Sequence, residues 1–276
     1  MSAPTDRDPS HLDANRRLWD HWTDLHHGAK FYDVDGFLRG ESTLRPIEVE
    51  EVGDVAGRSL LHLQCHFGLD TLSWARKGAK VTGVDLSDRA VDAAQQLAAD
   101  TELDARFLSS DLYHLDEALG DEQFDIVFTS YGVLCWLHDL QGWGQRVARR
   151  LRPGGRFHIV EFHPVLEAFS EDGRPFGHPY FGGGPPIETR ETESYADKGD
   201  SAEEPKDMKS YVWTHGLGEI VGALLDAGLV LDHLREHAES PYDCYPFTQE
   251  IAPGRSVVPG YEGKIPMLFS LQAHKG

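Results

Sequence analysis

The chain has 276 residues, with 46 acidic and 26 basic side chains and a formal net charge of −20. This acidic balance disfavours a nucleic acid or an anionic membrane as a partner. Hydrophobic residues make up 40% of the chain, which is enough for the core of one large domain. The three cysteines form no CxxC motif, and no membrane-spanning or signal-peptide segment is recognisable, so a cytoplasmic protein is expected.

The amino-terminal region is expected to form a helical cap. Apolar residues recur at helical spacing over residues 11–26, with Ser10 as the expected N-cap. A loop is expected at residues 31–36, and a second short helix at Pro46–Val52. The first helix either covers the sheet or closes its aromatic side chains over a bound ligand.

The stretch from residue 60 to residue 85 is the most informative part of the chain. Residues 60–63 form a short apolar run that is typical of a strand covered on both faces. Helical spacing then begins at Gly68 and ends at Gly78, and a second apolar strand ends at Asp85. This order predicts a βαβ unit whose loop lies at a strand's carboxyl end, where open α/β sheets bind nucleotides.

Asp85 follows the loop at a spacing that is typical of nucleotide sites. A carboxylate about twenty residues past such a loop can accept hydrogen bonds from both ribose hydroxyls of an adenosine. The helix that starts near Gly68 offers unpaired N–H groups and its positive dipole end to an anion. That anion would be a pyrophosphate in a dinucleotide site or the methionine carboxylate in an S-adenosylmethionine site. Alternatively, Asp85 only caps the helix that begins near Ser87.

A second acidic residue is expected at the same edge of the sheet. Ala105–Ser109 is predicted to be the third strand, and Asp111 follows it by about one turn. A carboxylate there can accept a hydrogen bond from the adenine amino group while Leu112 covers the ring. The alternative is that Asp111 only forms a turn.

The next strand is the most strongly patterned in the chain. Residues 124–130 read Phe-Asp-Ile-Val-Phe-Thr-Ser and deliver Ser130 and Tyr131 to the carboxyl edge. A helix over residues 142–151 is predicted to lead into a Leu-Arg-Pro-Gly-Gly turn at residues 151–155. The fifth strand is expected over residues 157–163.

The loop, Asp85, Asp111, the Phe-Asp-Ile-Val strand and the Leu-Arg-Pro-Gly-Gly turn together resemble a class I S-adenosylmethionine-dependent methyltransferase over roughly residues 58–163. The resemblance implies an α/β, Rossmann-like sheet of seven mostly parallel strands, with helices on both faces and an antiparallel last strand. It also implies S-adenosyl-L-methionine as the cofactor. The cofactor-binding residues that it implies are Gln64, Cys65, His66 and Gly68 in the loop, Asp85 and Leu86 after the second strand, Asp111 and Leu112 after the third, and Ser130 after the fourth.

The loop departs from the family's usual pattern. The family usually has Asp-x-Gly-Cys-Gly-x-Gly, whereas residues 62–68 read His-Leu-Gln-Cys-His-Phe-Gly. Side chains at Gln64 and His66 restrict the backbone and fill space that glycines leave open. We expect these two groups to contact the methionine carboxylate; the alternative is a weaker affinity for the cofactor. A metal site formed by His62, Cys65 and His66 is disfavoured, because strand alternation turns His62 and Cys65 to opposite faces.

The segment from residue 164 to residue 212 is not needed for a minimal sheet of this kind. It is rich in Pro, Gly and aromatic residues up to residue 186 and strongly acidic over residues 188–205. An insertion after the fifth strand would stand over the carboxyl edge, so a substrate lid is expected. A disordered acidic surface loop is the alternative for its middle part.

The carboxyl-terminal part is expected to complete the sheet. A helix is predicted over residues 216–227, a sixth strand over residues 229–237, a Pro-rich connection over residues 241–263 and a final strand over residues 266–273. The expected organisation is a single methyltransferase domain over residues 1–276. Its parts are an amino-terminal helical cap (1–53), a cofactor-binding half (58–163), an inserted substrate lid (164–212) and a carboxyl-terminal helix and hairpin (213–276).

The mechanism that the resemblance implies depends mainly on positioning, because a sulfonium methyl group is already activated. Positioning can contribute on the order of 7–11 kcal/mol. An amine or hydroxyl acceptor must also lose a proton, often to a nearby side chain. Tyr131 and His163 are the expected catalytic residues. Glu161, which faces the same side as His163 by strand alternation, is a further candidate.

Three functional classes remain open from the sequence. The leading one is a methyltransferase that acts on a nitrogen or oxygen of a small-molecule acceptor, as a monomer or homodimer without a metal. The second is a module that binds S-adenosylmethionine without catalysis. The third is a nicotinamide-dependent oxidoreductase, which would require a glycine-rich pyrophosphate turn that this loop lacks.

Overall fold

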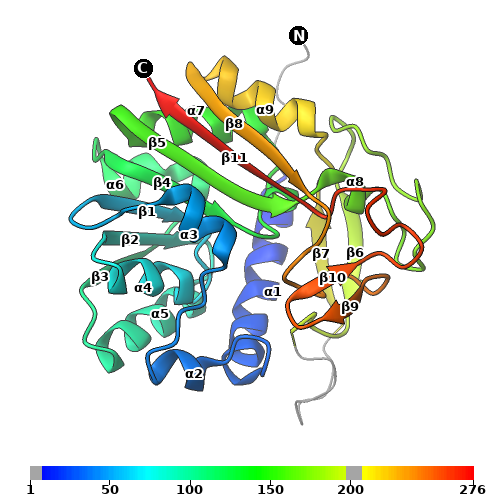
Figure 1. Ribbon diagram of the computed structural model, residues 1–276, viewed down its shortest axis with the longest axis horizontal. Helices are drawn as coiled ribbons and strands as arrows, with labels where there is room; N and C mark the ends of the chain where they lie inside the picture. Colours follow the sequence, from blue (N-terminus) through cyan, green and yellow to red (C-terminus); the bar gives the residue numbers. More distant parts are fainter. Residues whose placement is uncertain (1–7, 197–206) are drawn as a thin grey trace.

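The computed structural model describes residues 8–196 and 207–276, and a seven-stranded sheet lies at its centre (Figure 1). In spatial order the strands are β3 (Ala105–Ser109), β2 (Lys80–Asp85), β1 (Ser59–Leu63), β4 (Phe124–Ser130), β5 (Leu151–Phe162), β11 (Leu268–Lys275) and β8 (Leu229–His237). The strands from β3 to β5 are parallel, and β11 is antiparallel to both of its neighbours, β5 and β8. The predicted Rossmann-like sheet with an antiparallel last strand is confirmed.

The strand order places a crevice at the carboxyl ends of β1 and β4. The chain passes from β1 to β2 and β3 on one side, and then returns to β4 on the other side of β1. The helices that follow β1 and β4 therefore leave on opposite faces, and the space between them is the usual ligand site of an open α/β sheet.

Helices cover both faces of the sheet because alternate strand residues are apolar on both sides. One face packs against α3 (Pro46–Val52), α4 (Leu69–Arg76) and α5 (Asp88–Asp100), and the other against α6 (Leu115–Leu119), α7 (Leu140–Arg150) and α9 (Leu217–Asp226). In β1, Leu60 packs with Trp74 on the first face, and Leu61 packs with Trp143 on the second. All four of these side chains are fully buried, which explains the continuous apolar run of β1.

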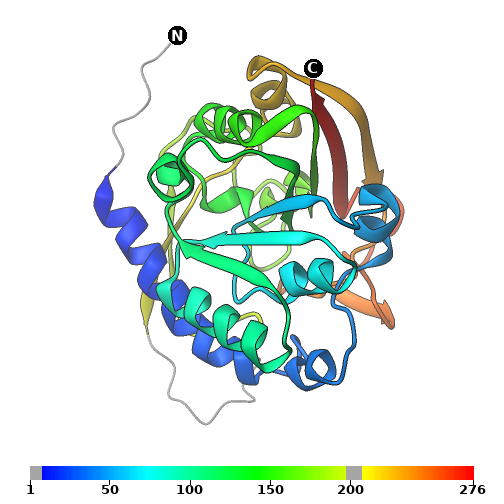
Figure 2. The same cartoon turned by 90° about the vertical axis from the view of Figure 1, so that its left-hand side faces the viewer.

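A cap lies over the carboxyl edge of the parallel strands. It consists of α1 (Pro9–Gly28), α2 (Val34–Leu38) and the antiparallel hairpin of β6 (Ile187–Glu191) and β7 (Met208–Val212). Figure 2 shows α1, in dark blue, running beside α5, with which it packs. The Asn15 side chain joins α1 to β7, because its amide donates to the Tyr211 carbonyl (2.8 Å) and its oxygen accepts from the Tyr211 N–H (2.8 Å).

Several local elements differ from those expected from the sequence. Helix α1 begins at Pro9 and its N-cap is Asp8, whose carboxylate accepts from the Ser10 N–H, so the expected Ser10 cap is wrong. Helix α2 occupies part of the expected loop at residues 31–36. A hairpin of β9 (Gln249–Ala252) and β10 (Arg255–Val257) lies within the expected connection, and the short helix α8 (Pro164–Glu167) follows β5.

Two other expectations concern longer stretches. The Leu-Arg-Pro-Gly-Gly turn lies inside β5: Phe124 and Ile126 of β4 pair with Leu151 and Arg156, so the extra β5 residues bulge out between these pairs. The acidic stretch, for which a disordered surface loop is the alternative to a lid, begins with β6, and residues 197–206 lie outside the described part of the chain. Across residues 8–196 and 207–276, no helix combines the length and the apolar character needed to cross a bilayer.

Candidate active site

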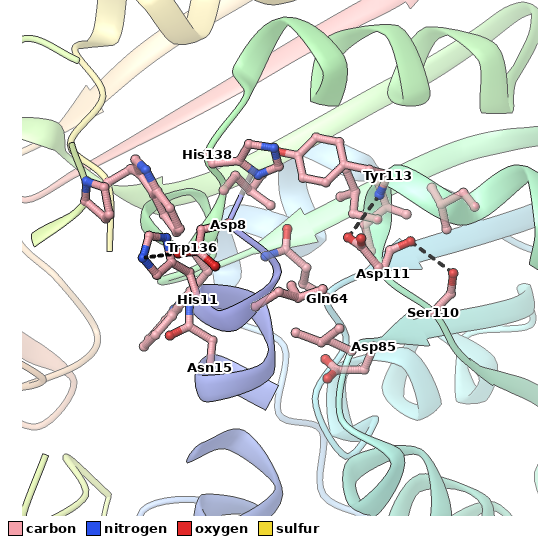
Figure 3. Close-up of a pocket in the computed structure, with 18 of the residues that line it drawn as sticks. Asp8, His11, Asn15, Gln64, Asp85, Ser110, Asp111, Tyr113, Trp136 and His138 are labelled. Atoms are coloured by element: carbon pink, nitrogen blue, oxygen red, sulfur yellow. Dashed lines mark hydrogen bonds and ion pairs between the residues drawn. The ribbon is translucent and has the colours of Figure 1, made fainter. Parts of the chain in front are cut away.

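A cavity of about 450 Å³ opens at the carboxyl ends of β1, β2 and β3 (Figure 3). Its inner wall is formed by residues that follow these strands, and its outer wall by the start of α1, the segment after β4 and residues 183–186. In Figure 3, Asp85 and Asp111 lie on one side, His11 and Trp136 lie on the other, and Gln64 lies between them. The cavity therefore brings together residues that are far apart in the chain.

Asp85 ends β2, and its carboxylate lines the cavity. One oxygen accepts the backbone N–H of His66 (2.7 Å), and the other accepts the backbone N–H of Ser87 (2.9 Å). Burial raises the pKa of Asp85 to about 6, although these N–H donors oppose that shift. Two fixed donors orient the carboxylate, which leaves its remaining lone pairs available to hydroxyl groups of a ligand.

Asp111 lies beside Asp85 because the two strand ends are joined. The N–H of Ser110 donates to the carbonyl of Asp85 (2.8 Å), so the segment after β3 lies against the end of β2. The Asp111 carboxylate caps the short 3₁₀ helix η1 (Leu112–His114) by accepting from the Tyr113 N–H (3.2 Å), and it pairs with His114 (3.0 Å). Leu112 is buried directly after it, and both residues line the cavity.

The glycine-poor loop at residues 62–68 retains the backbone conformation that glycine favours. Gln64 and His66 have φ angles of 56° and 50°, which lie in the left-handed region. The Gln64 side chain lines the cavity, and its amide donates to the carbonyl of Val133 (3.0 Å). Its Oε1 atom is buried and has no hydrogen-bond partner among the described residues. Gln64 therefore holds an unpartnered acceptor just beneath the cavity wall.

The glycine at the end of this loop is required by packing. A Cβ atom on Gly68 would lie 2.7 Å from the Phe107 ring, and one on Gly83 in β2 would lie 2.6 Å from the same ring. Gly68 also has a φ angle of 83° and is the N-cap of α4. These two glycines let the loop, β2 and β3 approach closely, which places the start of α4 next to the crevice.

The side chains of Cys65 and His66 point away from the cavity. Cys65 packs in the apolar cluster beneath the loop, with Phe67 and Phe107. The His66 ring contacts α1 instead, where its Nε2 atom lies 2.8 Å from Nδ1 of His26. His66 acts on the cavity through its backbone, whose N–H donates to the Asp85 carboxylate that lines the cavity. The structure thus does not support the expectation that the His66 side chain contacts a bound cofactor.

Ser130 and Tyr131 lie in a separate polar cluster behind the loop. The Ser130 hydroxyl donates to Asp70 (3.2 Å), and Tyr131 has a φ angle of 39° that turns its ring toward Tyr242, at 4.8 Å between centroids. Burial raises the pKa of Tyr131, as does the nearby Glu48 carboxyl group. Burial also raises the pKa of Glu48, to about 8. Neither Ser130 nor Tyr131 lines the cavity.

His163 and Glu161 serve local structure at the end of β5. His163 is the N-cap of α8, where its Nδ1 atom accepts from the Val165 N–H (3.1 Å), and its Nε2 atom pairs with Glu236 at 3.1 Å. Burial lowers the pKa of His163, and Glu236 opposes that shift. The Glu161 carboxylate accepts the backbone N–H groups of residues 132–134, including that of Val133 at 2.7 Å. It therefore holds the segment after β4 in place.

The structure thus divides the expected site residues into two groups. Those that line the cavity are Gln64, Asp85, Leu86, Asp111 and Leu112. Those that lie outside its lining are Cys65, His66, Gly68, Ser130, Tyr131 and His163. The roles assigned to all of them stay predictions, and the placement of the second group gives no support for direct contact with a ligand in that cavity.

Sequence reasoning missed the outer wall of the cavity. His11 and Asn15 come from α1, Trp136 and His138 follow β4, and Trp213 follows β7. The helical periodicity of α1 indicated which residues share a face, but no local pattern shows that this face meets Trp213. The fold creates that contact over about two hundred residues of sequence, as the Asn15–Tyr211 hydrogen bonds show.

Comparisons with known proteins agree with this geometry. Residues 61–159 match the family described as a methyltransferase domain. The ubiquinone biosynthesis O-methyltransferase of Shewanella pealeana is 28% identical over 148 residues, which cover 52% of this chain and 61% of that protein. The protein of the same name from Xanthomonas oryzae pv. oryzae is 31% identical over 51% of this chain and 59% of its own length. The chain thus spans about three fifths of these curated relatives.

Solved structures show the same fold. An S-adenosylmethionine-dependent methyltransferase from Mesorhizobium loti superimposes with a TM-score of 0.57 and 22% identity, covering 86% of this chain and all of that chain. A putative one from Listeria monocytogenes has a TM-score of 0.55 and 20% identity, covering 83% of this chain and 96% of its own. Residues 61–159 thus match a methyltransferase domain, and the described chain has the fold of the class I S-adenosylmethionine-dependent methyltransferases. S-adenosyl-L-methionine is the cofactor of this class, and the oriented Asp85 carboxylate at the cavity wall fits such a ligand.

Proposed function

We propose that this protein transfers a methyl group from S-adenosylmethionine to an oxygen or nitrogen atom of a small-molecule acceptor. The observation that carries the proposal is the pair of carboxylates, Asp85 and Asp111, at adjacent strand ends in one cavity. Asp85 would bind the ribose hydroxyls, and Asp111 the adenine amino group, with Leu86 and Leu112 against the nucleoside. Gln64 would accept a hydrogen bond from the amino-acid tail.

The chemistry requires little of the protein beyond placement. When bound, the cofactor supplies a sulfonium methyl group, which moves to the acceptor while the electron pair of the broken carbon–sulfur bond stays on sulfur. The cavity walls orient the two reactants and exclude water. A hydroxyl or neutral amine acceptor also releases one proton. His11 and His138 line the cavity and are the imidazoles that could take it.

The names of the curated relatives favour oxygen as the acceptor atom, because two of them are called ubiquinone biosynthesis O-methyltransferases. The net charge of −20 supports a small molecule over a nucleic acid. The three cysteines are free, which supports a cytoplasmic location. We also propose that residues 164–212 act as the substrate lid, because residues 183–186 of this segment form part of the cavity wall.

The first test is binding. Isothermal titration calorimetry with S-adenosylmethionine, S-adenosylhomocysteine and NAD should show binding of the two adenosyl compounds, and that binding should weaken in Asp85→Asn and Asp111→Asn. Asp92→Asn, an exposed position on α5, is the matched control for the loss of one charge. Tighter binding of NAD, or equal binding by all variants, would remove the basis of the proposal.

The second test separates catalysis from binding alone. The side chains at Gln64 and His66 favour the alternative of a non-catalytic binding module, since they replace glycines of the usual loop. Metabolite pools incubated with the protein and a methyl-labelled donor should yield a labelled product. If the protein binds the donor but labels nothing above the Asp85→Asn background, the binding-module alternative takes precedence.

A further inference from the structure

Four rings form the outer wall of the cavity, and we call them the aromatic rim: His11, Trp136, His138 and Trp213. The Trp213 ring lies close to both imidazoles, with its centroid 6.2 Å from that of His11 and 6.0 Å from that of His138. The interplanar angles are 59° and 57°, so these rings do not stack flat on one another. Their faces are therefore not fully covered by each other.

The aromatic rim is held by hydrogen bonds and stacking from three elements. The His11 ring stacks on Tyr211 of β7, with 4.1 Å between centroids. The N–H of Trp213 donates to the carbonyl of Cys135 (2.7 Å), in the 3₁₀ helix η2 (Leu134–Trp136). The Trp136 indole donates to the carbonyl of Gly132 (2.9 Å). These contacts hold three of the four rings in place, which lowers the entropic cost of binding a rigid ring.

Apart from its two imidazoles, the side chains in the described lining of the cavity that are charged at neutral pH are all carboxylates. Asp8, Asp85 and Asp111 line it, and none of its described lining residues is Lys or Arg. Asp85 and Asp111 lie on the inner wall, whereas Asp8 lies on the outer wall, 3.8 Å from the His11 imidazole. With the cofactor bound to Asp85 and Asp111, an acceptor that carries a carboxylate or phosphate would still meet the Asp8 carboxylate, and no lysine or arginine of the described lining would pair with it.

We propose that the acceptor is a planar ring compound that is neutral or carries an ammonium group, and that bears no carboxylate or phosphate. This proposal rests on the proposed methyltransferase function and names the substrate class of the same cavity. The aromatic rim offers ring faces for stacking and for a cation. The Asp8 carboxylate adds attraction for an ammonium group.

Matched pairs of ring compounds test the proposal directly. Dopamine and 3,4-dihydroxyphenylacetate share a catechol ring and differ in an ammonium or a carboxylate side chain, and tryptamine and indole-3-acetate form a second such pair. Catechol serves as the neutral probe. Binding to the protein saturated with S-adenosylhomocysteine, measured by calorimetry, should favour each amine over its acid by about tenfold or more, because the acid meets like charge and no lysine or arginine of the described lining.

Two variants locate the recognition. Trp213→Leu should weaken binding of both members of a pair by about tenfold, because a stacking face is lost. Phe181→Leu is the matched control, since Phe181 is 79% exposed and does not line the cavity. Asp8→Asn keeps an oxygen that can accept from the Ser10 N–H, and it should reduce the preference for the amine by about two- to fivefold.

The outcomes separate this proposal from the proposed function. S-adenosylhomocysteine affinity is measured first, and its absence would overturn the methyltransferase assignment itself. With that ligand bound, equal or tighter binding of the carboxylate members would overturn the substrate class. Binding of none of the five ring compounds would overturn it as well. Unchanged affinities in Trp213→Leu, together with an unchanged preference for the amines in Asp8→Asn, would show that another surface recognises them.

Discussion

Replacement of Asp85 by Asn tests the central assignment of the cavity. The carboxylate already accepts the N–H groups of His66 and Ser87, so its free lone pairs are directed to the cavity. In Asp85→Asn, one oxygen becomes an NH₂ group, which can no longer accept from a backbone donor or a ribose hydroxyl. A hydrogen bond to a charged group contributes about 1.5–3 kcal/mol net. Since about 1.4 kcal/mol is a factor of ten, we expect affinity for S-adenosylhomocysteine to fall by about 10- to 150-fold.

The pH dependence of binding gives an independent check on the same residue. The pKa of Asp85 is raised to about 6, mainly by burial. Above that pH the carboxylate is ionised and accepts from the ribose hydroxyls, whereas below it protonation removes an acceptor. Wild-type affinity should therefore be flat above about pH 7 and fall toward about tenfold per pH unit well below pH 6. Asp85→Asn has no such group and should show no fall of this origin.

Calorimetric titrations from about pH 5 to about pH 8 measure both effects. The control is Asp92→Asn, which removes an equal charge at an exposed site on α5, with unfolding temperatures confirming that each variant is folded. If Asp85→Asn binds S-adenosylhomocysteine within about twofold of wild type at pH 7.5, the carboxylate does not contribute a ligand hydrogen bond of the size expected. A wild-type affinity that stays constant down to pH 5 would contradict the same assignment.

Three further predictions concern stability, measured by urea unfolding. Gly144→Ala should destabilise the protein by about 1–3 kcal/mol, because its Cβ would lie 2.4 Å from the Ala223 carbonyl oxygen. Gly222→Ala has open space around its Cβ and should stabilise α9 by about 0.5–1 kcal/mol. Equal effects of the two substitutions would contradict the close packing of α7 on α9. Burial raises the pKa of Glu48 to about 8 in the folded protein. The free energy of unfolding should therefore decline as the pH rises from the pKa of Glu48 in the unfolded chain toward 8, and Glu48→Gln should remove that decline. The same pH dependence in wild type and Glu48→Gln would refute the burial of this acid. His66→Gly should lower the free energy of unfolding by about 1–3 kcal/mol, because the contact of the ring with His26 is lost. The affinity for S-adenosylhomocysteine should stay within about threefold, because the backbone N–H to Asp85 is kept. A large loss of affinity would show that the imidazole itself contacts the ligand.

The sequence predicted the sheet and the acidic pair because both depend on local pattern. Apolar runs mark the strands. Asp85 ends β2 and Asp111 comes shortly after β3, so parallel pairing of these strands places both residues at one edge. Tyr131 also follows a strand, yet its backbone conformation, with a φ angle of 39°, turns the ring toward Tyr242 and away from the cavity. No propensity rule predicts that angle for a tyrosine.

The outer wall could not be predicted for a different reason. Trp213 reaches the cavity because β7 packs on α1 and because its backbone bonds to Cys135, and both contacts depend on the complete fold. The hairpin of β9 and β10 was missed because its strands of four and three residues are too short to show a period of two. Short elements and distant contacts carry little local signal, and the acceptor side of this cavity consists mainly of such parts.

The glycine-poor loop is the point at which pattern and structure differ most. Left-handed conformations at Gln64 and His66 cost about 1–2 kcal/mol each for residues with a Cβ atom, so the chain must offset that cost. The Gln64 amide does so through Val133, and the His66 ring does so through His26. Because the backbone path is kept, the His66 N–H still reaches Asp85, and the added side chains leave the loop in different directions. Loss of the glycines therefore changes what surrounds the loop while the carboxylate that it orients stays in place.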